Sequence, residues 1–436
     1  RMVPIQLDGE NHTPGRMSAP ATRVFIRPAA LMMMERALSA NPHATADGSH
    51  LKALLERAQA LYGLSHRLTN EERQELTQSD PWVRLGAFVA EAARNGRNKV
   101  VLCLPPEWAS TAPWVEQVVE ESLGKGGKGF LIFHGEPLRP ARQYGNDVIF
   151  LQVAPSNLPD PEAEAAESLR AAGKPVLTLR IPVAPVEGVP LSLAEVAAFF
   201  LGWKIAVAVF GWMHDIVFVG QPAVEAYKKY ARDLRDNPGE VTFDSDSPYT
   251  ARFRSLTLNY QSLVKKGLVD YGDLETTVER LGGDVSDAAD VYAAILLLAR
   301  GAGRLGYLDF TYNGELSPSL SEVLSRARSV LAAGRLHVPA KIRTGPSDYH
   351  STEQSETDGP NELVSLRLVA LKHAAPIAGR YTDKFLLAQA RGTWQAMEDA
   401  GRWVLMLTLP GHNSDAAADL DAFFANVARR LPASGS

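Results

Sequence analysis

The sequence predicts an α/β fold in which helices cover a mostly parallel sheet. Short apolar runs rich in β-branched residues alternate with helical stretches from about residue 99 onward, as in strand–helix–strand units. The runs are continuously apolar, which is typical of strands buried on both faces. With 436 residues and 45% apolar content, the chain is large enough for one large core or two smaller ones.

The chain begins with four predicted helices, and four predicted strands follow. The helices cover residues 28–38, 51–62, 70–77 and 81–95, and the strands cover 99–104, 129–133, 148–153 and 176–181. Helices at 110–123 and 161–172 lie between the strands. A long helix over 192–213 begins at Ser192, with Glu195 as its capping-box partner.

The apolar stretch 196–219 is long enough to resemble a membrane span. Lys204, His214 and Asp215 interrupt it, and an ion at mid-membrane is costly. We therefore expect a helix buried inside the protein, followed by a strand, and no membrane partner.

The second half begins with a loop of turn-forming residues at 236–253. Predicted helices follow at 260–269, 274–281, 288–300, 320–333, 383–400 and 416–431, with a turn at 310–314 and strands at 365–371 and 403–409. This pattern predicts an N-terminal helical segment (1–80), one α/β domain (81–410) with an inserted helical region at about 236–340, and a C-terminal helix and tail (411–436).

Composition excludes several classes of function. The net charge of −5 comes from 45 basic and 50 acidic side chains that are mixed along the chain, so no nucleic acid partner is expected. The one cysteine, Cys103, lies in an apolar run, which predicts a buried structural thiol and a reducing, cytoplasmic setting. No cofactor or metal is predicted, since the chain lacks metal-ligand spacing, a phosphate-loop fingerprint and a nucleophile elbow.

Residues 114–123 read as an amphipathic helix with an inward stripe of valines, while Glu116 and Glu120 face outward. Gly124 is placed to end this helix in a left-handed conformation. Glu121 therefore lies on the last turn, close to Lys125 and Lys128. A carboxylate held near two ammonium groups is a candidate proton carrier. The alternative is a solvated helix end with ordinary surface charges.

The run Glu121-Ser122-Leu123-Gly124-Lys125 resembles the Glu-Ser-x-Gly-Lys motif of glucose-6-phosphate isomerases. Residues 80–138 as a whole are similar to the isomerase half of transaldolase–isomerase fusion proteins. The resemblance implies a three-layer αβα sugar-isomerase (SIS-type, flavodoxin-like) domain. It also implies that Glu121 is the base of the isomerisation.

Three further segments resemble motifs of the same family. In 221–228, Lys228 matches the lysine that helps to open the sugar ring. In 345–361, His350 matches the histidine that shuttles the ring-opening proton. In 15–18, Arg16 matches the arginine that stabilises the enediolate. Without the resemblance, these residues would read as a surface lysine, a surface histidine and an exposed loop arginine.

Two departures from the family pattern bear on function. Glu353 replaces a glycine and Glu356 lies where the family is basic, so the site is expected to be more negative than a phosphorylated substrate favours. The Ser/Thr-rich loop with which the family's first SIS domain binds phosphate does not occur in this sequence.

The resemblance implies an enzyme of glycolysis and gluconeogenesis that interconverts glucose 6-phosphate and fructose 6-phosphate through a cis-enediol. The alternative is a catalytically silent homologue that acts as a binding or scaffold subunit. The expected partners are the sugar phosphate and either a second copy in a homodimer or a companion chain that supplies the phosphate-binding domain.

Overall fold

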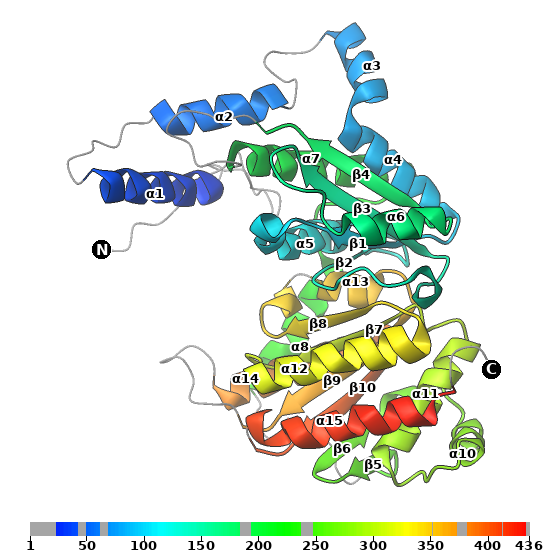
Figure 1. Cartoon of the computed structure of the whole chain (residues 1–436). Coiled ribbons are helices and arrows are strands. Elements are labelled where there is room, and N and C mark those ends of the chain that lie inside the picture. Colours follow the sequence, from blue (N-terminus) through cyan, green and yellow to red (C-terminus); the bar gives the residue numbers. More distant parts are fainter. Residues whose placement is uncertain are drawn as a thin grey trace. The chain divides into compact units, whose positions relative to one another are not determined.

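The computed structural model describes residues 23–41, 49–61, 69–183, 193–236, 247–350, 352–372, 382–411 and 413–432. Figure 1 shows its elements, coloured along the sequence from blue at the N-terminus to red at the C-terminus. They form two compact units. The first unit contains the described residues up to Leu123 together with 129–138 and 146–220; the second contains 124–128, 139–145 and the described residues from Gln221 onward.

The first unit is built on a four-stranded parallel sheet with the order β2-β1-β3-β4. This order is the start of the doubly wound, flavodoxin-like arrangement. Its strands are β1 (Lys99–Cys103), β2 (Leu131–Phe133), β3 (Val148–Pro155) and β4 (Val176–Ile181). All four coincide with predicted strands. Cys103 is buried in β1, and burial together with the charge of Glu162 raises its thiol pKa to about 12, so the thiol is inert as predicted.

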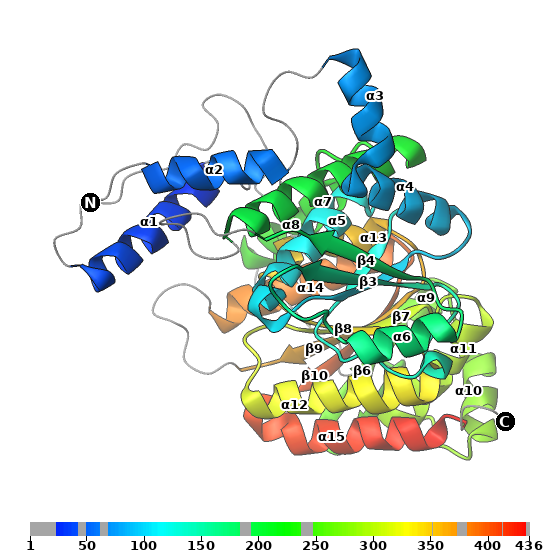
Figure 2. The same ribbon diagram turned by 45° about the horizontal axis from the view of Figure 1, so that its top comes forward.

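Helices α4, α5 and α7 pack together over this sheet (Figure 2), and Trp82, Phe199 and Trp203 form the aromatic centre of that core. Asp80 caps α4 by accepting hydrogen bonds from the N–H groups of Trp82 and Val83. The helical elements of this unit are α1 (Arg23–Ala40), α2 (Ser49–Leu61), α3 (Asn70–Ser79), α4 (Pro81–Arg94), η2 (Pro106–Thr111), α5 (Ala112–Leu123), α6 (Ala163–Ala171) and α7 (Leu193–His214).

Among the described residues, α7 is the one helix long and apolar enough to cross a membrane by length and composition. Phe199, Trp203 and Phe210 on this helix are fully buried in the core of the first unit. Its apolar character is therefore explained by packing inside the protein, as predicted. The strand expected after this helix is wrong, because 215–221 form no strand before α8 begins.

The second unit contains a six-stranded sheet with the order β5-β6-β10-β9-β7-β8. Strands β8, β7, β9 and β10 are parallel and repeat the 2-1-3-4 order of the first unit, while β6 and β5 extend the β10 edge in antiparallel pairing. The bounds are β5 (Thr250–Phe253), β6 (Leu256–Asn259), β7 (Tyr307–Tyr312), β8 (Ala340–Thr344), β9 (Leu363–Ala370) and β10 (Trp403–Leu409).

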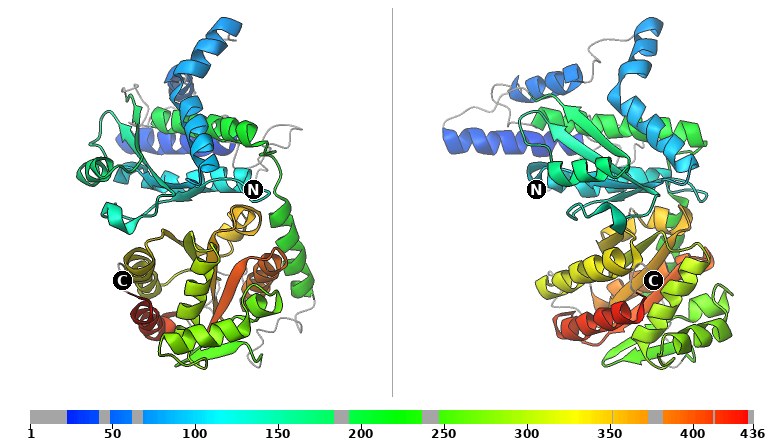
Figure 3. Two further views of the ribbon diagram at one scale, coloured as in Figure 1. Left: turned by 90° about the vertical axis from the view of Figure 1, so that its right-hand side faces the viewer. Right: turned by 45° about the vertical axis from the view of Figure 1, so that its right-hand side comes forward.

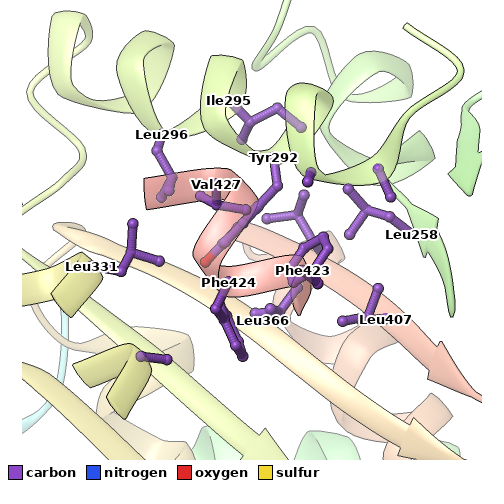
Figure 4. Packing of buried hydrophobic residues seen from close by; sticks show 14 of the residues in the cluster. Leu258, Tyr292, Ile295, Leu296, Leu331, Leu366, Leu407, Phe423, Phe424 and Val427 are labelled. Atoms are coloured by element: carbon purple, nitrogen blue, oxygen red, sulfur yellow. The ribbon is translucent and has the colours of Figure 1, made fainter. Parts of the chain in front are cut away.

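Helices lie on both faces of this second sheet (Figure 3), which makes the unit a three-layer αβα structure. One face is apolar: Tyr292 of α11 and Phe423 of α15 stack over it, as Figure 4 shows. The other face carries charged side chains under α13 and α14. The helical elements are η3 (Ala141–Gln143), α8 (Pro222–Asp236), α9 (Gln261–Lys265), α10 (Tyr271–Arg280), α11 (Ala288–Gly301), α12 (Pro318–Ala327), η5 (Arg328–Leu336), η6 (Asp348–His350), α13 (Glu353–Asp358), α14 (Asp383–Asp399) and α15 (Asn413–Arg430).

The α/β class and the helix-covered, mostly parallel sheet are confirmed, but the described residues form two such sheets where one was predicted. The turn predicted at 310–314 is wrong, because 307–312 form the buried strand β7. The region 236–340, expected to be helical, contains β5, β6 and β7. The expected boundaries at 80 and 410 do not coincide with the division between the units.

Candidate functional site

Glu121 lies on the last turn of α5 and is only 3% exposed. Its Oε2 accepts a hydrogen bond of 3.0 Å from the side-chain amide of Gln117, one turn earlier on the same helix. Val115, Val118 and Val119 are fully buried, so the predicted stripe does pack inward and draws the end of α5 into the core. Glu121 is therefore a buried, amide-bonded carboxylate, and the alternative of a solvated helix end is wrong.

The prediction that Glu116 and Glu120 face outward is also wrong. Glu120 is fully buried, and its Oε1 accepts the backbone N–H of Ile132 at 2.9 Å. Glu116 Oε2 lies 3.0 Å from Nε2 of His134, just beyond the same strand. The reason is that β2 is an edge strand beside α5, and its outer backbone groups need partners from that helix.

Helix α5 ends at Leu123 as predicted, and the loop 124–128 that follows belongs to the second unit. Gly126 and Gly127 adopt φ angles of 60° and 73°, which favour glycine. Gly124 does not share this left-handed conformation. Glycine is required there by close packing, because a Cβ would lie 2.5 Å from the Cα of Ser355 in α13.

We expect Gly124→Ala to displace this loop from α13 and to lower the free energy of unfolding by about 1–3 kcal/mol, as overpacking typically does. Urea unfolding measures the effect. The matched control is Gly301→Ala at the end of α11, where a Cβ meets no atom of the described residues within 4 Å. Equal stability of the two variants would contradict the proposed packing constraint.

Helix α8 carries Lys228, whose side chain is 30% exposed and forms an ion pair of 2.8 Å with Glu225 one turn earlier. The preceding residue, Tyr227, is fully buried and packs edge-on against Tyr349, with ring centroids 6.4 Å apart. Tyr349 directly precedes His350. The segments that carry Lys228 and His350 therefore meet through neighbouring aromatic side chains.

The other predicted site residues are less fully described. His350 closes the short helix η6, and its side chain lies outside the described structure. Arg16 also lies outside the described residues. Glu121 belongs to the first unit, whereas Lys228 and His350 belong to the second. Convergence of the four side chains on one substrate stays a prediction.

Helix α13 joins three segments that are far apart in the sequence. Gln354 is fully buried; its Nε2 donates to the carbonyl of Gly124 at 3.0 Å, and its Oε1 accepts the N–H of Ala223 at 2.9 Å. Gly127 adds a second link, since its N–H donates to the carbonyl of Asp358 at 2.8 Å. The loop after Glu121, the first turn of α8 and the helix after His350 are thus hydrogen-bonded together.

A network of buried charges lies beneath α13. Arg367 of β9 is 1% exposed and pairs with Glu353 at 3.1 Å and with Glu356; Arg343 of β8 pairs with Glu356 and lies 3.6 Å from Asp309. The expectation that Glu353 and Glu356 make the site more negative is therefore wrong. Both carboxyl groups point into the second unit, where buried arginines lie against them.

The network holds its carboxyl groups at different pKa values. Burial, with the neighbouring Glu356 and Asp309, raises the pKa of Glu353 to about 8 despite the opposing effect of Arg367. For Glu356 the combined charges of Arg343, Arg367 and Lys341 outweigh burial and lower the pKa. Burial, with the neighbouring Glu356, also raises the pKa of Asp309. Glu353 is thus one member of the network that holds a proton near neutrality.

This assignment predicts a pH-dependent effect of Glu353→Gln. Between the ordinary value of 4.5 and about 8, folded Glu353 keeps a proton that the unfolded chain has lost. Rising pH therefore lowers the free energy of unfolding of the native protein through this group, and glutamine removes that slope. Urea unfolding across this window should show the variant gaining stability relative to the native protein as pH rises. A constant difference would contradict the raised pKa.

Three residues of the candidate site were not predicted from the sequence. Gln117 lies one helical turn before Glu121, and that spacing could have indicated it. Arg367 lies within the predicted apolar strand 365–371, where a single charge implies a buried partner. Gln354 lies in the segment 345–361 that resembles the histidine motif, but its links to Ala223 and Gly124 had no local signal, because these partners are 131 and 230 residues away.

No family model and no curated protein matches this chain. Structural neighbours at low identity include a glucose-6-phosphate isomerase from Chlamydia trachomatis (10% identity, TM-score 0.27, covering 94% of this chain and 81% of that one). The C-terminal domain of glucosamine-fructose-6-phosphate aminotransferase from Francisella tularensis is another (11% identity, TM-score 0.23, covering 88% and 97%).

A third neighbour is a hypothetical protein from Thermus thermophilus, with 13% identity and a TM-score of 0.27 over 93% of this chain and 95% of that one. These scores are too low for the likeness to carry an argument about function. The α/β class rests instead on the strand order of the two sheets.

Proposed function

We propose that this chain interconverts an aldose phosphate and a ketose phosphate, with glucose 6-phosphate and fructose 6-phosphate as the pair. Glu121 removes the proton from C2 of the open-chain aldose and returns it to C1 of the cis-enediol. The carbonyl moves from C1 to C2, so the reaction consumes no oxidant or reductant. A buried carboxylate that accepts a hydrogen bond from an amide suits this role, because the protein around it excludes bulk water from the reacting atoms.

The other motif residues have assisting roles in this proposal. Lys228 and His350 help to open the sugar ring, since an amine and an imidazole exchange protons with ring and hydroxyl oxygens. Arg16 stabilises the negative charge of the enediolate. The phosphate is held by a second copy of the chain or by a companion chain.

One observation carries the proposal. The three described segments that resemble the isomerase motifs are joined in one unit: the loop 124–128, the start of α8 and residues 349–358 contact one another through buried groups. Independent surface features would have no reason to meet in this way. The link was not part of the motif resemblance, so it supports the proposal separately.

The test is incubation of the native protein with fructose 6-phosphate in deuterated water. We expect glucose 6-phosphate to form and to carry deuterium at C2, because a proton held by a carboxylate exchanges with solvent. A coupled assay measures the product and mass spectrometry measures the label. A protein that forms no product and incorporates no label is the silent homologue instead, and the proposal fails.

A further inference from the structure

We infer that Gln354 is a positioning residue for the proposed isomerisation: its side-chain amide sets where the loop after Glu121 and the first turn of α8 lie. This inference rests on the proposed function. It assigns a role to a residue that contacts neither the substrate nor the reacting atoms.

The hydrogen bonds of Gln354 specify an amide in one orientation. Its Nε2 faces two acceptors, the carbonyl of Gly124 at 3.0 Å and Oδ2 of Asp358 at 3.3 Å. Its Oε1 faces a donor, the N–H of Ala223 at 2.9 Å. A glutamine amide has two N–H donors and one carbonyl acceptor, so it satisfies all three partners. An ionised carboxylate at this position would face two acceptors with no proton to offer.

The two backbone groups that Gln354 binds lie where a helix begins and where a helix ends. Ala223 follows Pro222 at the start of α8, and its N–H is the first that the helix itself leaves unsatisfied. Lys228 lies five residues further on, about 7.5 Å along the helix axis. Gly124 is three residues after Glu121, at the point where α5 gives way to the loop.

The helix that carries Gln354 is fixed to the sheet by buried ion pairs. Gln354 is 0% exposed on α13, whose neighbouring Glu353 and Glu356 are tied to Arg367 and Arg343 of the sheet. The side chain therefore joins a helix anchored in the core of the second unit to the start of α8, which carries Lys228, and to the loop that follows Glu121 in the chain. An error of about 1 Å in such placement costs on the order of 100-fold in rate.

The test compares Gln354→Glu with Gln354→Met across a range of pH. At alkaline pH we expect the glutamate variant to lose on the order of 100-fold in kcat with a smaller change in KM. Burial and the carboxylate of Asp358 raise the pKa of the introduced acid. As the pH falls it takes up a proton and again offers one donor and one acceptor, so its kcat relative to the native protein should recover. The methionine variant has no proton to gain, and its loss should be the same at every pH.

The matched control is Gln389→Glu on α14, a buried glutamine whose side-chain oxygen has no hydrogen-bond partner in the described part of the chain. We expect no pH-dependent recovery of kcat in this variant. Three results would overturn the positioning role: native kcat in Gln354→Glu at alkaline pH, a loss that does not change with pH, or the same profile in the Gln389 control.

Failure of the proposed function gives a different result. In that case the native protein itself forms no glucose 6-phosphate, and the positioning role falls with it. An active native protein with an unaffected Gln354→Glu variant overturns the positioning role alone.

Discussion

Glu121→Gln is expected to lower kcat for sugar-phosphate isomerisation by about 10²–10⁴-fold, the range that a positioned general base contributes. Glutamine keeps the size of the side chain but cannot take up the C2 proton. Its carbonyl oxygen can still accept the hydrogen bond from Gln117, so the end of α5 should stay folded. The coupled assay measures kcat, and deuterium incorporation at C2 should fall in parallel.

The matched control for this variant is Glu120→Gln on the same helix. Glu120 is also buried, but its Oε1 accepts the N–H of Ile132 in β2, a bond that an amide oxygen can replace. We expect this variant to retain native kcat. An active Glu121→Gln protein would show that another group moves the proton, and equal losses in both variants would point to damage to α5.

Arg367→Met is expected to destabilise the protein by about 3–5 kcal/mol, because it leaves the buried carboxyl groups of Glu353 and Glu356 without their shared cation. Methionine approximates the length of the arginine stem, so the missing charge is the main change. Equilibrium unfolding in urea measures the effect. Adding Glu353→Gln to this variant should restore part of the stability, since it removes the buried acid that has lost its arginine.

An exposed ion pair provides the control for this second variant. Arg326 lies 2.9 Å from Asp421, and both side chains are about half exposed. Arg326→Met is expected to cost less than about 1 kcal/mol. A similar small loss in Arg367→Met would mean that the network beneath α13 contributes little to stability.

The strands of the first unit were predictable because each is a continuous apolar run bounded by turn-forming residues. Strand β7 was missed for a physical reason. It alternates Leu308 and Phe310, which face the apolar core, with Asp309 and Thr311, which face the charged network. Polar residues in a short segment suggest a turn. They fit a buried strand here because the charged network lies against that face of the sheet.

The sequence by itself determined the α/β class, most helices and most parallel strands, and the residues that resemble isomerase motifs, because helix and strand periodicity and short motifs are local properties. Only the tertiary structure decided that Glu120 and Glu121 are buried, that Glu353 lies against Arg367, and that Gln354 links three distant segments. Burial and charge pairing depend on residues that approach one another only when the chain folds, and no local pattern encodes those partners.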